Sequence, residues 1–306
     1  MQMIDFLTNN IGIIGALGAT ASWAVAGVLF KILGERLDPI GMTAAKTLFS
    51  VLLLFPAVLF FYGFSLTWNH FLLIALSGLI GIAIGDTLFF AALSKLSPLL
   101  LSIILLVCPD IFSGILGIIF LSEMPSLYTW IGIICILIPM GYLAVHDALQ
   151  EKQTRSTIIG IVLGLLSIIC TAVSMTLIKP ILQGESVVKV TMFRMLCGFI
   201  ALVCVGLKKK AAKKWLTSFT ASSDYTWKFI ATTSLVTYGG FYLSMLSVKH
   251  LDLVVASTLM ALEPLFIIPA MIILKKHKTD WKEIVSLLLA VVGILIITMF
   301  NTNNME

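Results

Sequence analysis

Long apolar runs alternate with short polar breaks along the whole chain. A helix that crosses a bilayer needs ~20 mostly apolar residues. Ten runs of about this length cover residues 11–33, 39–62, 69–92, 97–121, 128–147, 156–178, 188–207, 227–248, 252–274 and 281–300. Because a membrane-spanning strand has only ~10 residues with strict alternation, we interpret these runs as helices. The pattern predicts an all-α membrane protein with ten transmembrane helices.

The composition supports a membrane location for these runs. Hydrophobic residues make up 59% of the 306 residues, charged residues make up 11%, and the mean hydropathy is +1.09. Charged residues usually account for about a quarter of a soluble domain. This chain lacks the polar residues that a water-facing surface needs, so the lipid bilayer is its first expected partner.

The two halves of the chain resemble each other. An offset of 148 residues pairs Lys31 with Lys179 and Lys46 with Arg194. These pairs are informative because charged residues are rare inside apolar runs. Further pairs, at offsets of 148, 155 and 151 residues, are Leu29 with Leu177, Thr43 with Thr191, Gly85 with Gly240, Pro109 with Pro264, and Trp130 with Trp281.

The paired residues predict two repeats of five helices, residues 1–150 and 151–306. The offset first changes at a longer Lys-rich loop in the second half, Lys208 to Lys228. Because five is an odd number, the second repeat must enter the membrane from the opposite side. Inverted repeats of this kind let a transporter alternate access around a site near the bilayer midplane.

The net charge of +5 reports on orientation and does not indicate a nucleic-acid partner. Fifteen of the 20 Lys and Arg residues belong to one side of the predicted membrane: Lys31, Arg36, Lys95, Lys152, Arg155, Lys208, Lys209, Lys210, Lys213, Lys214, Lys228, Lys275, Lys276, Lys278 and Lys282. Lys179, Lys189 and Lys249 belong to the other side, and Lys46 and Arg194 lie within runs. Since cytoplasmic loops carry the excess of positive charge, we expect both termini outside the cytoplasm and the chain in the cell inner membrane.

We expect no cofactor and no metal site. The five cysteines, Cys108, Cys135, Cys170, Cys197 and Cys204, all fall within apolar runs, without a CxxC pair or a nearby His at metal-ligand spacing. Buried cysteines of this kind behave as small hydrophobic residues. No segment resembles a nucleotide-binding loop, so transport would be driven by an ion or proton gradient or by the substrate's own gradient.

Several segments resemble the EamA-type branch of the drug/metabolite transporter superfamily. They are SWAVAGVLFK (Ser22 to Lys31), AALSKL (Ala91 to Leu96), CPDIFSGILGIIFLSE (Cys108 to Glu123) and LEPLF (Leu262 to Phe266). The third is similar to the Pro-x-x-x…Leu-Gly-Glu pattern of the family's fourth helix. Lys46 and Arg194 fall where the family tends to carry a cation. The resemblance covers essentially the whole chain and implies transport of a small molecule.

Two features depart from that family. The second repeat lacks a Glu after its fourth run and has Lys275, Lys276, His277 and Lys278 instead. Members of the family usually keep their termini in the cytoplasm, whereas the charge count here places them outside.

Five ionisable residues lie inside apolar runs: Lys46, Asp86, Asp110, Arg194 and Glu263. Each costs roughly 2.5–3.5 kcal/mol at a helix centre on insertion scales, so each needs a reason. Asp110 and Glu263 lie next to prolines at equivalent places in the two repeats, which favours a cation, amine or proton site. A cavity-facing role for Asp86 and anion binding by the two cations are further hypotheses. Alternatively, pairing among the five fixes helix packing, or the cations snorkel to the interface.

Aromatic residues offer a second set of candidates. Trp23, Tyr238 and Tyr242, with Phe241 beside them, lie at mid-depth in the first and eighth runs, where they can stack on a ligand or simply pack. The tryptophans near run ends are typical of an interfacial belt; they are Trp68, Trp130, Trp215 and Trp281.

The sequence best fits a secondary transporter for a small metabolite, amino-acid-like, amine or drug-like, with proton coupling left open. The alternative is a membrane-embedded enzyme acting on a lipid or prenyl substrate. Such enzymes hold Mg²⁺ and a diphosphate with acidic clusters, and the short loops contain no Asp-x-x-Asp arrangement. A channel or scaffold is a third class, but no repeated filter sequence is visible. The expected partners are a small-molecule substrate and protons, and the expected state is a monomer or homodimer.

Overall fold

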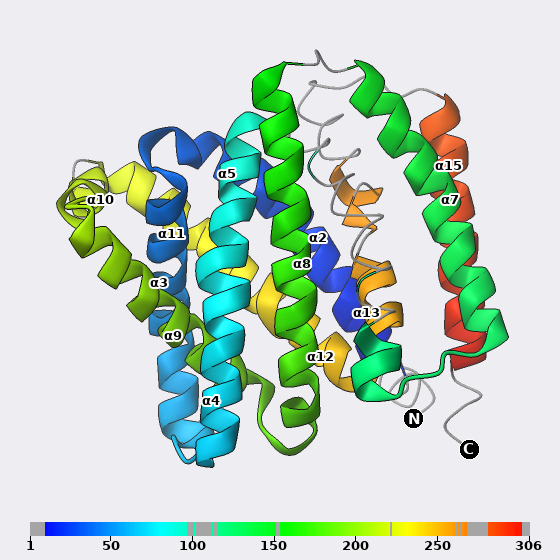
Figure 1. Cartoon of the computed structure of the whole chain (residues 1–306), viewed down its shortest axis with the longest axis horizontal. Helices are drawn as coiled ribbons and strands as arrows, with labels where there is room; N and C mark the ends of the chain where they lie inside the picture. The colour runs from blue at the N-terminus through cyan, green and yellow to red at the C-terminus, as the bar shows by residue number, and fades with distance from the viewer. Residues whose placement is uncertain are drawn as a thin grey trace.

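The structure is all-helical wherever it is described. The computed structural model describes residues 10–96, 101, 112, 116–150, 154–220, 222–260, 262, 263, 265–267 and 281–301, and no strand occurs among them (Figure 1). The helices are α2 (Ile11–Leu33), α3 (Pro39–Ala57), α4 (Trp68–Ser77), α5 (Thr87–Lys95), α7 (Leu127–Gln150), α8 (Arg155–Gly184), α9 (Val187–Lys208), α10 (Ala212–Thr220), α11 (Ser223–Ser234), α12 (Leu243–His250), α13 (Leu253–Met260) and α15 (Trp281–Asn301). A 3₁₀ segment, η1 (Gly34–Arg36), and three π-helical segments, η2 (Val58–Tyr62), η3 (Gly78–Asp86) and η4 (Leu235–Tyr242), continue them.

Within the described residues, six helices are long and apolar enough to cross a membrane. They are Ile11–Arg36, Pro39–Tyr62, Trp68–Lys95, Arg155–Gly184, Val187–Lys208 and Ser223–His250. Shorter apolar helices include Leu127–Pro139 and Ile284–Met299. The prediction of an all-α, multi-pass membrane protein is therefore confirmed. The run predicted at 97–121 lies mostly outside the described residues, so the total of ten spans stays a prediction.

Local sequence signals fix where several helices begin. The Thr67 hydroxyl accepts the N–H of His70 at 3.3 Å at the start of α4. The Thr154 hydroxyl accepts the N–H of Thr157 at 3.2 Å at the start of α8. Both bonds satisfy backbone donors that a first helical turn leaves unpaired. Pro39 opens α3, where the missing N–H costs nothing.

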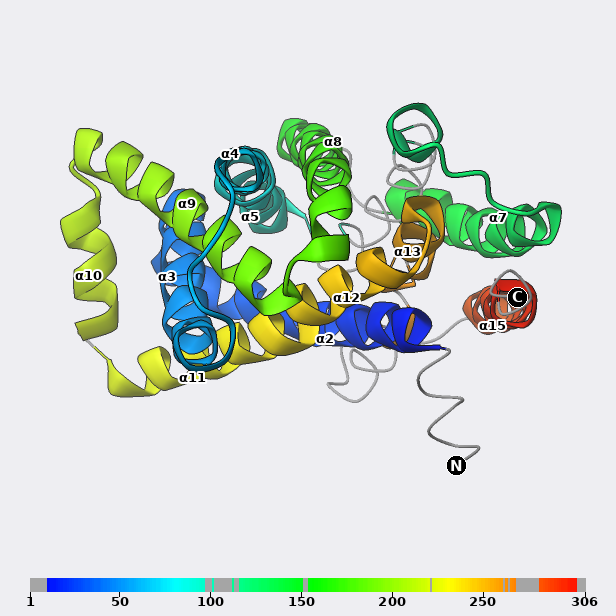
Figure 2. The same cartoon turned by 90° about the horizontal axis from the view of Figure 1, so that it is seen from below.

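The two repeats pack through equivalent helices. In the first repeat α2 packs against η4 and α12 of the second, and in the second repeat α8 packs against η3 and α5 of the first. The second helices of the repeats, α3 and α9, also pack together, as do α7 and α15 (Figures 1 and 2). The interior is therefore shared between the repeats.

Glycine allows one of these pairs to approach closely. Gly132 of α7 and Gly293 of α15 face each other, and a Cβ added to Gly293 would lie 2.7 Å from the carbonyl oxygen of Gly132. Small residues bring helix backbones together in bilayers, where no hydrophobic effect drives helix association. Figure 2 shows α7 and α15 side by side at one edge of the molecule.

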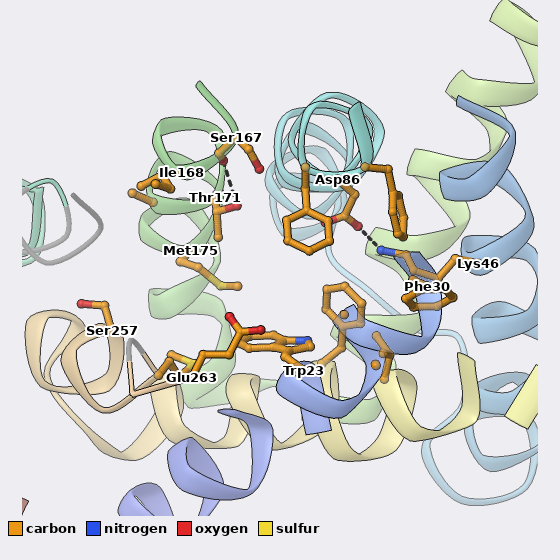
Figure 3. Close-up of a pocket in the computed structure, with 18 of the residues that line it drawn as sticks. Trp23, Phe30, Lys46, Asp86, Ser167, Ile168, Thr171, Met175, Ser257 and Glu263 are labelled. Atoms are coloured by element: carbon orange, nitrogen blue, oxygen red, sulfur yellow. Dashed lines mark hydrogen bonds and ion pairs between the residues drawn. The ribbon is translucent and has the colours of Figure 1, made fainter. Parts of the chain in front are cut away.

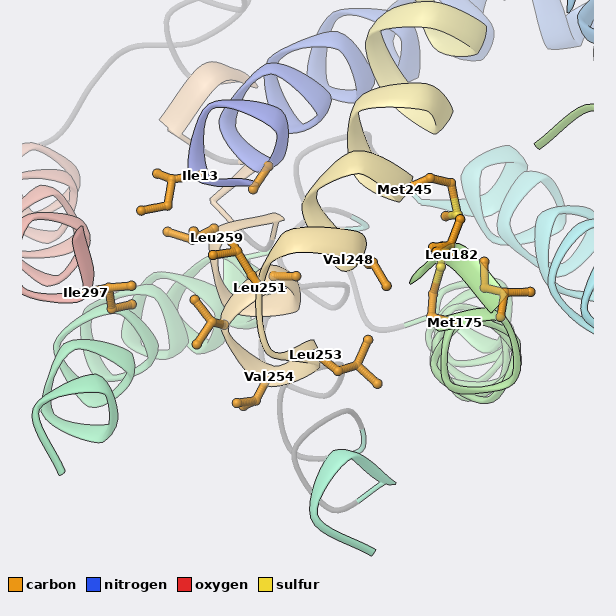
Figure 4. Close-up of a cluster of buried hydrophobic side chains, with 14 of the residues drawn as sticks. Ile13, Met175, Leu182, Met245, Val248, Leu251, Leu253, Val254, Leu259 and Ile297 are labelled. Atoms are coloured by element: carbon orange, nitrogen blue, oxygen red, sulfur yellow. The ribbon is translucent and has the colours of Figure 1, made fainter. Parts of the chain in front are cut away.

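Buried apolar side chains form two main clusters. The first joins α2, α8, α12 and α13 with Ile297 of α15 (Figure 4). The second surrounds Phe30, Phe90 and Phe229, whose rings pack edge to face. Outside the clusters large apolar side chains point outward; Phe60 and Phe61 are 76% and 80% exposed. Such a surface fits contact with lipid.

Part of the Lys-rich segment of the second repeat forms a helix that its sequence did not predict. After the end of α9, Lys210 has φ +55°, and the N–H of Ala211 donates to the carbonyl of Gly206 at 2.9 Å. The next helix, α10, places Trp215 at 8% exposure, with its ring N–H donating to Asp38 Oδ1 at 2.5 Å. Trp215 therefore packs against the protein and is not exposed on its surface.

Candidate functional site

A cavity of about 200 Å³ lies between the two repeats (Figure 3). Its walls come from α2, α3, η3 and α5 of the first repeat and from α8, η4, α12 and α13 of the second. Most of the lining is apolar, with the rings of Trp23, Phe30, Phe90 and Phe241 prominent among it. A cavity of this kind, apolar with a few polar groups, is typical of a small-molecule site.

One ion pair lies in the cavity wall. The ammonium of Lys46, on α3, pairs with the carboxylate of Asp86, the last residue of η3. Lys46 is 3% exposed, and its ammonium lies 4.6 Å from the ring centre of Phe241 and 5.6 Å from that of Phe90. The carboxylate and the two ring faces together stabilise a cation that burial removes from water.

A second carboxylate, that of Glu263, lines the cavity without a partner. Glu263 is 9% exposed, and among the described residues no hydrogen bond or ion pair reaches its carboxylate. Its nearest small neighbour is Gly27, where an added Cβ would lie 3.8 Å from Glu263 Oε1. Figure 3 shows the carboxylate directed into the cavity beside the indole of Trp23. A buried carboxylate without a partner is costly, which points to a bound proton or cation.

Trp23 is held against the second repeat by a glycine. A Cβ on Gly240 would collide with the Trp23 indole, so only glycine at this point of η4 lets the ring lie there. The indole meets Phe241 edge to face, with ring centres 6.2 Å apart. Trp23 therefore contacts both the ligand space and the helix that carries Phe241.

Arg194 is buried behind the cavity wall and does not line it. It is 1% exposed; Nη2 donates to the Ser174 hydroxyl at 2.8 Å, and Nη1 contacts the Met245 sulfur at 3.1 Å. Its Nε has no hydrogen-bond partner in the described part of the chain. Among the described residues, the structure thus pairs Lys46 but not Arg194 with a carboxylate.

The two predicted tyrosines lie outside the cavity lining. The Tyr238 hydroxyl donates to the carbonyl of Leu53 at 2.7 Å, and the residue is 46% exposed. Tyr242 packs against the first buried cluster. Phe241, between them, lines the cavity instead. Asp110 lies outside the described residues.

The sequence reasoning missed lining residues on α8. Ser167, Thr171 and Met175 line the cavity from the second repeat. The offset of 148 residues would have found two of them, because it pairs Thr171 with Trp23 and Met175 with Gly27. The described residues contain no group of three or more His, Cys, Asp or Glu side chains that could hold a metal ion.

These features define a multi-pass membrane protein with a central cavity between two helical repeats. The model of the EamA-like transporter family matches residues 10–142 and 158–299. The chain therefore belongs to the EamA-like transporter family, and each half matches it once.

One similar solved structure is described only as the crystal structure of a protein. It gives a TM-score of 0.71 at 13% sequence identity, with 98% of this chain and 98% of that chain covered. At that identity the likeness shows the shared fold alone. No curated protein matches the sequence.

Proposed function

We propose that the protein is a secondary transporter that moves a small organic substrate across the inner membrane by alternating access. In this proposal residues 1–150 and 151–306 form two inverted five-helix repeats, with ten spans in all. The Lys208–Lys228 segment faces the cytoplasm, and both termini lie on the other side. Family membership and the equivalent contacts of α2 and α8 support this arrangement. A cavity between inverted repeats can open to either side when one repeat rocks against the other.

The observation that carries the proposal is the carboxylate of Glu263. It is buried, it faces a cavity shared by both repeats, and the described residues give it no partner. Ionisable residues inside membrane proteins mark substrate or ion pathways, because a charge without a function is expensive there. By contrast, the Lys46–Asp86 pair in the same wall neutralises itself.

The cavity suits an amphipathic amine. Its apolar walls bury the body of such a molecule, and Glu263 offers the one carboxylate in the described lining that is free to bind an ammonium group. The Trp23 ring beside it adds a face that attracts cations. A proton competes for the same carboxylate, so an inward proton gradient would drive the amine out.

The test is uptake of a labelled metabolite panel into proteoliposomes, with and without a pH gradient. Panel members should include apolar amines, amino acids and neutral compounds of similar size. We expect concentrative transport of an amine with the wild-type protein. Glu263→Gln keeps size and hydrogen bonding but cannot titrate, so it should lose concentrative transport while substrate exchange partly survives.

Glu35→Gln provides a matched control. Glu35 is exposed in the segment that follows α2, so this variant makes the same carboxylate-to-amide change outside the cavity. It should transport like the wild type. The proposal fails if Glu263→Gln still concentrates substrate on a pH gradient as well as the wild type does. It also fails if no panel member is transported by well-folded protein.

A further inference from the structure

A second buried ion pair lies beyond one end of the cavity. The ammonium of Lys179, on α8, pairs with the carboxylate of Glu123, and their side chains are 11% and 10% exposed. Lys179 also donates to the carbonyl of Leu251 at 2.5 Å. The carboxylate of Glu123 accepts the N–H of Leu253 at 2.6 Å. One ion pair and two charge-assisted hydrogen bonds thus join these four residues, here called the Glu123–Lys179 cluster.

The Glu123–Lys179 cluster joins the two repeats. Glu123 follows helical residues 116–121 of the first repeat, whereas Lys179 and the turn between α12 and α13 belong to the second. A tight turn fixes the position of Glu123: Ser122 has φ +55°, and the Glu123 N–H donates to the carbonyl of Gly117 at 3.1 Å. Ser122 ends the helix in the left-handed conformation, a position where glycine is the usual residue. The first repeat therefore presents its carboxylate at a defined point.

The Glu123–Lys179 cluster borders one end of the cavity. Met175 lines the cavity and lies one helical turn before Lys179 on α8. Leu253 also lines it, while its own N–H is bound by Glu123. Figure 4 shows Met175 and Leu253 on facing elements at this end. Separation of Glu123 from Lys179 would thus remove the contact between the first repeat and α8 where the cavity wall ends.

The equivalent lysine in the other half also binds carbonyls at a helix end. Lys31, which the 148-residue offset pairs with Lys179, donates to the carbonyls of Leu93 and Leu96 at the end of α5. Leu96 corresponds to Leu251 at the offset of 155 residues. Where Glu123 would have its counterpart, the sequence has three lysines and a histidine at 275–278. A lysine that binds helix-end carbonyls is thus common to both ends.

We infer that Glu123 and Lys179 form the gate that closes the cavity on the side of the α12–α13 turn. The inference rests on the proposed transport function, because a gate has meaning only if the cavity opens in turn to both sides. In the closed state the pair holds the first repeat onto the second. In the open state Glu123 leaves Lys179 and moves away together with helical residues 116–121, while Lys179 keeps its bond to the Leu251 carbonyl and so holds the α12–α13 turn on α8.

The test measures access to the cavity and needs no substrate. A single cysteine at Ser257, which lines the cavity, is introduced into a cysteine-free variant. Its reaction with a membrane-impermeant thiol reagent, added on the side of the α12–α13 turn, is then timed. Glu123→Gln keeps a hydrogen-bond acceptor for Leu253 but removes the charge. We expect it to raise the labelling rate about tenfold by populating the open state.

Two further variants guard against misfolding. Lys179→Gln removes the other charge and should give the same rise. The exchanged pair Glu123→Lys with Lys179→Glu should return the rate toward that of the parent.

Glu185→Gln is the matched control, since Glu185 pairs with Lys189 in the turn between α8 and α9 and does not line the cavity. It should leave the labelling rate unchanged. Unchanged labelling in folded Glu123→Gln and Lys179→Gln overturns the gate, as does an equal rise in Glu185→Gln. If Glu263→Gln loses coupling but Glu123→Gln and Lys179→Gln leave the labelling rate unchanged, the proposed transport function stands and the gate is rejected. The failure of the gate can therefore be told from the failure of the transport function.

Discussion

Lys46 and Arg194 occupy equivalent places in the two repeats but have different surroundings. Lys46 pairs with Asp86 in the wall of the cavity. At the offset of 155 residues, the position of Asp86 corresponds to Phe241 in the second repeat. Arg194 has no carboxylate partner among the described residues and bonds to Ser174 and Met245 instead. In the described part of the chain the repeats therefore share a cation site, and the acid that forms an ion pair there comes from the first repeat.

The difference shows how duplicated halves can divide their roles. Phe241 replaces the acid in the second repeat, and its ring face lies 4.6 Å from the ammonium of Lys46 in the first. One position of the third helix thus supplies a charge in one repeat and an aromatic surface in the other, and both act on Lys46. The cavity is consequently asymmetric in charge although its scaffold is repeated.

Loss of Asp86 should have the largest effect on stability. Asp86→Asn leaves the ammonium of Lys46, 3% exposed, without its counter-charge. Removal of one partner of a buried pair costs ~3–5 kcal/mol, so we expect a strongly lowered melting temperature for protein purified in detergent. The double variant Lys46→Met with Asp86→Leu should recover most of the loss. An Asp86→Asn protein as stable as the wild type would contradict the ion pair.

Replacement of Arg194 should have a much smaller effect, which is the sharpest test of the comparison. Arg194→Met leaves no carboxylate unpaired, and Ser174 keeps its hydrogen bonds to Ser77. We expect the free energy of unfolding to change by no more than ~1 kcal/mol. Lys46→Met, which strands Asp86, is the paired measurement and should cost several times more. Equal losses in both variants would mean that Arg194 has a charged partner as well.

Two left-handed residues at helix ends should respond alike, one in each repeat. Ser122 and Lys210 both have φ +55°, where a side chain costs ~1–2 kcal/mol and glycine does not. Ser122→Gly and Lys210→Gly should each raise the free energy of unfolding by about 1 kcal/mol. Lys209, with φ −80°, is the control. Lys209→Gly should not stabilise; if it does, the gain is not conformational.

Two acidic residues in turns of the second repeat should show small pH effects of opposite sign. Burial, with the nearby charge of Glu123, raises the pKa of Asp252. Burial alone would also raise the pKa of Glu185, but hydrogen bonds from Lys189 and His70 and their charges lower it. Asp252 therefore destabilises increasingly as pH rises through its raised pKa. Glu185 stabilises above its ordinary pKa, and this is lost as pH falls through its lowered pKa.

Melting temperatures of Asp252→Asn and Glu185→Gln, compared with the wild type between about pH 3 and about pH 7, measure both effects. The advantage of Asp252→Asn over the wild type should shrink toward low pH. The deficit of Glu185→Gln should shrink in the same direction. A deficit of Asp252→Asn at neutral pH would show that the Asp252 carboxylate stabilises the fold.

Helix positions were predictable because membrane thickness sets their length. For the run predicted at 11–33 the structure has a helix at Ile11–Leu33, and for the run at 188–207 it has a helix at Val187–Lys208. The helix α10 could not be predicted in this way, because its nine residues mix charged and apolar positions and do not form a membrane-spanning run. Its burial of Trp215 depends on Asp38, far away in the sequence.

For the candidate site, charge inside apolar runs was a sufficient signal for Lys46, Asp86 and Glu263. The pairing of acids with cations could not be predicted from the sequence, because it depends on how the helices face one another. Of the three aromatic residues named in the eighth run, Phe241 lines the cavity, whereas Tyr238 and Tyr242 do not. They lie in η4, a π-helical segment, whose wider turn changes which side chains share a face. A sequence read at 3.6 residues per turn cannot show that change.

The contact between Gly132 and Gly293 also bears on the order in which the chain is made. α7 belongs to the first repeat, yet the helix that covers its glycine face, α15, belongs to the second and is synthesised later. At ~5–20 residues per second, the wait is on the order of ten seconds. During that interval α7 has only lipid, or a helper protein in the membrane, against this face. The glycine face of the first repeat is therefore covered only after α15 of the second has been synthesised, so the first repeat cannot complete its packing before that.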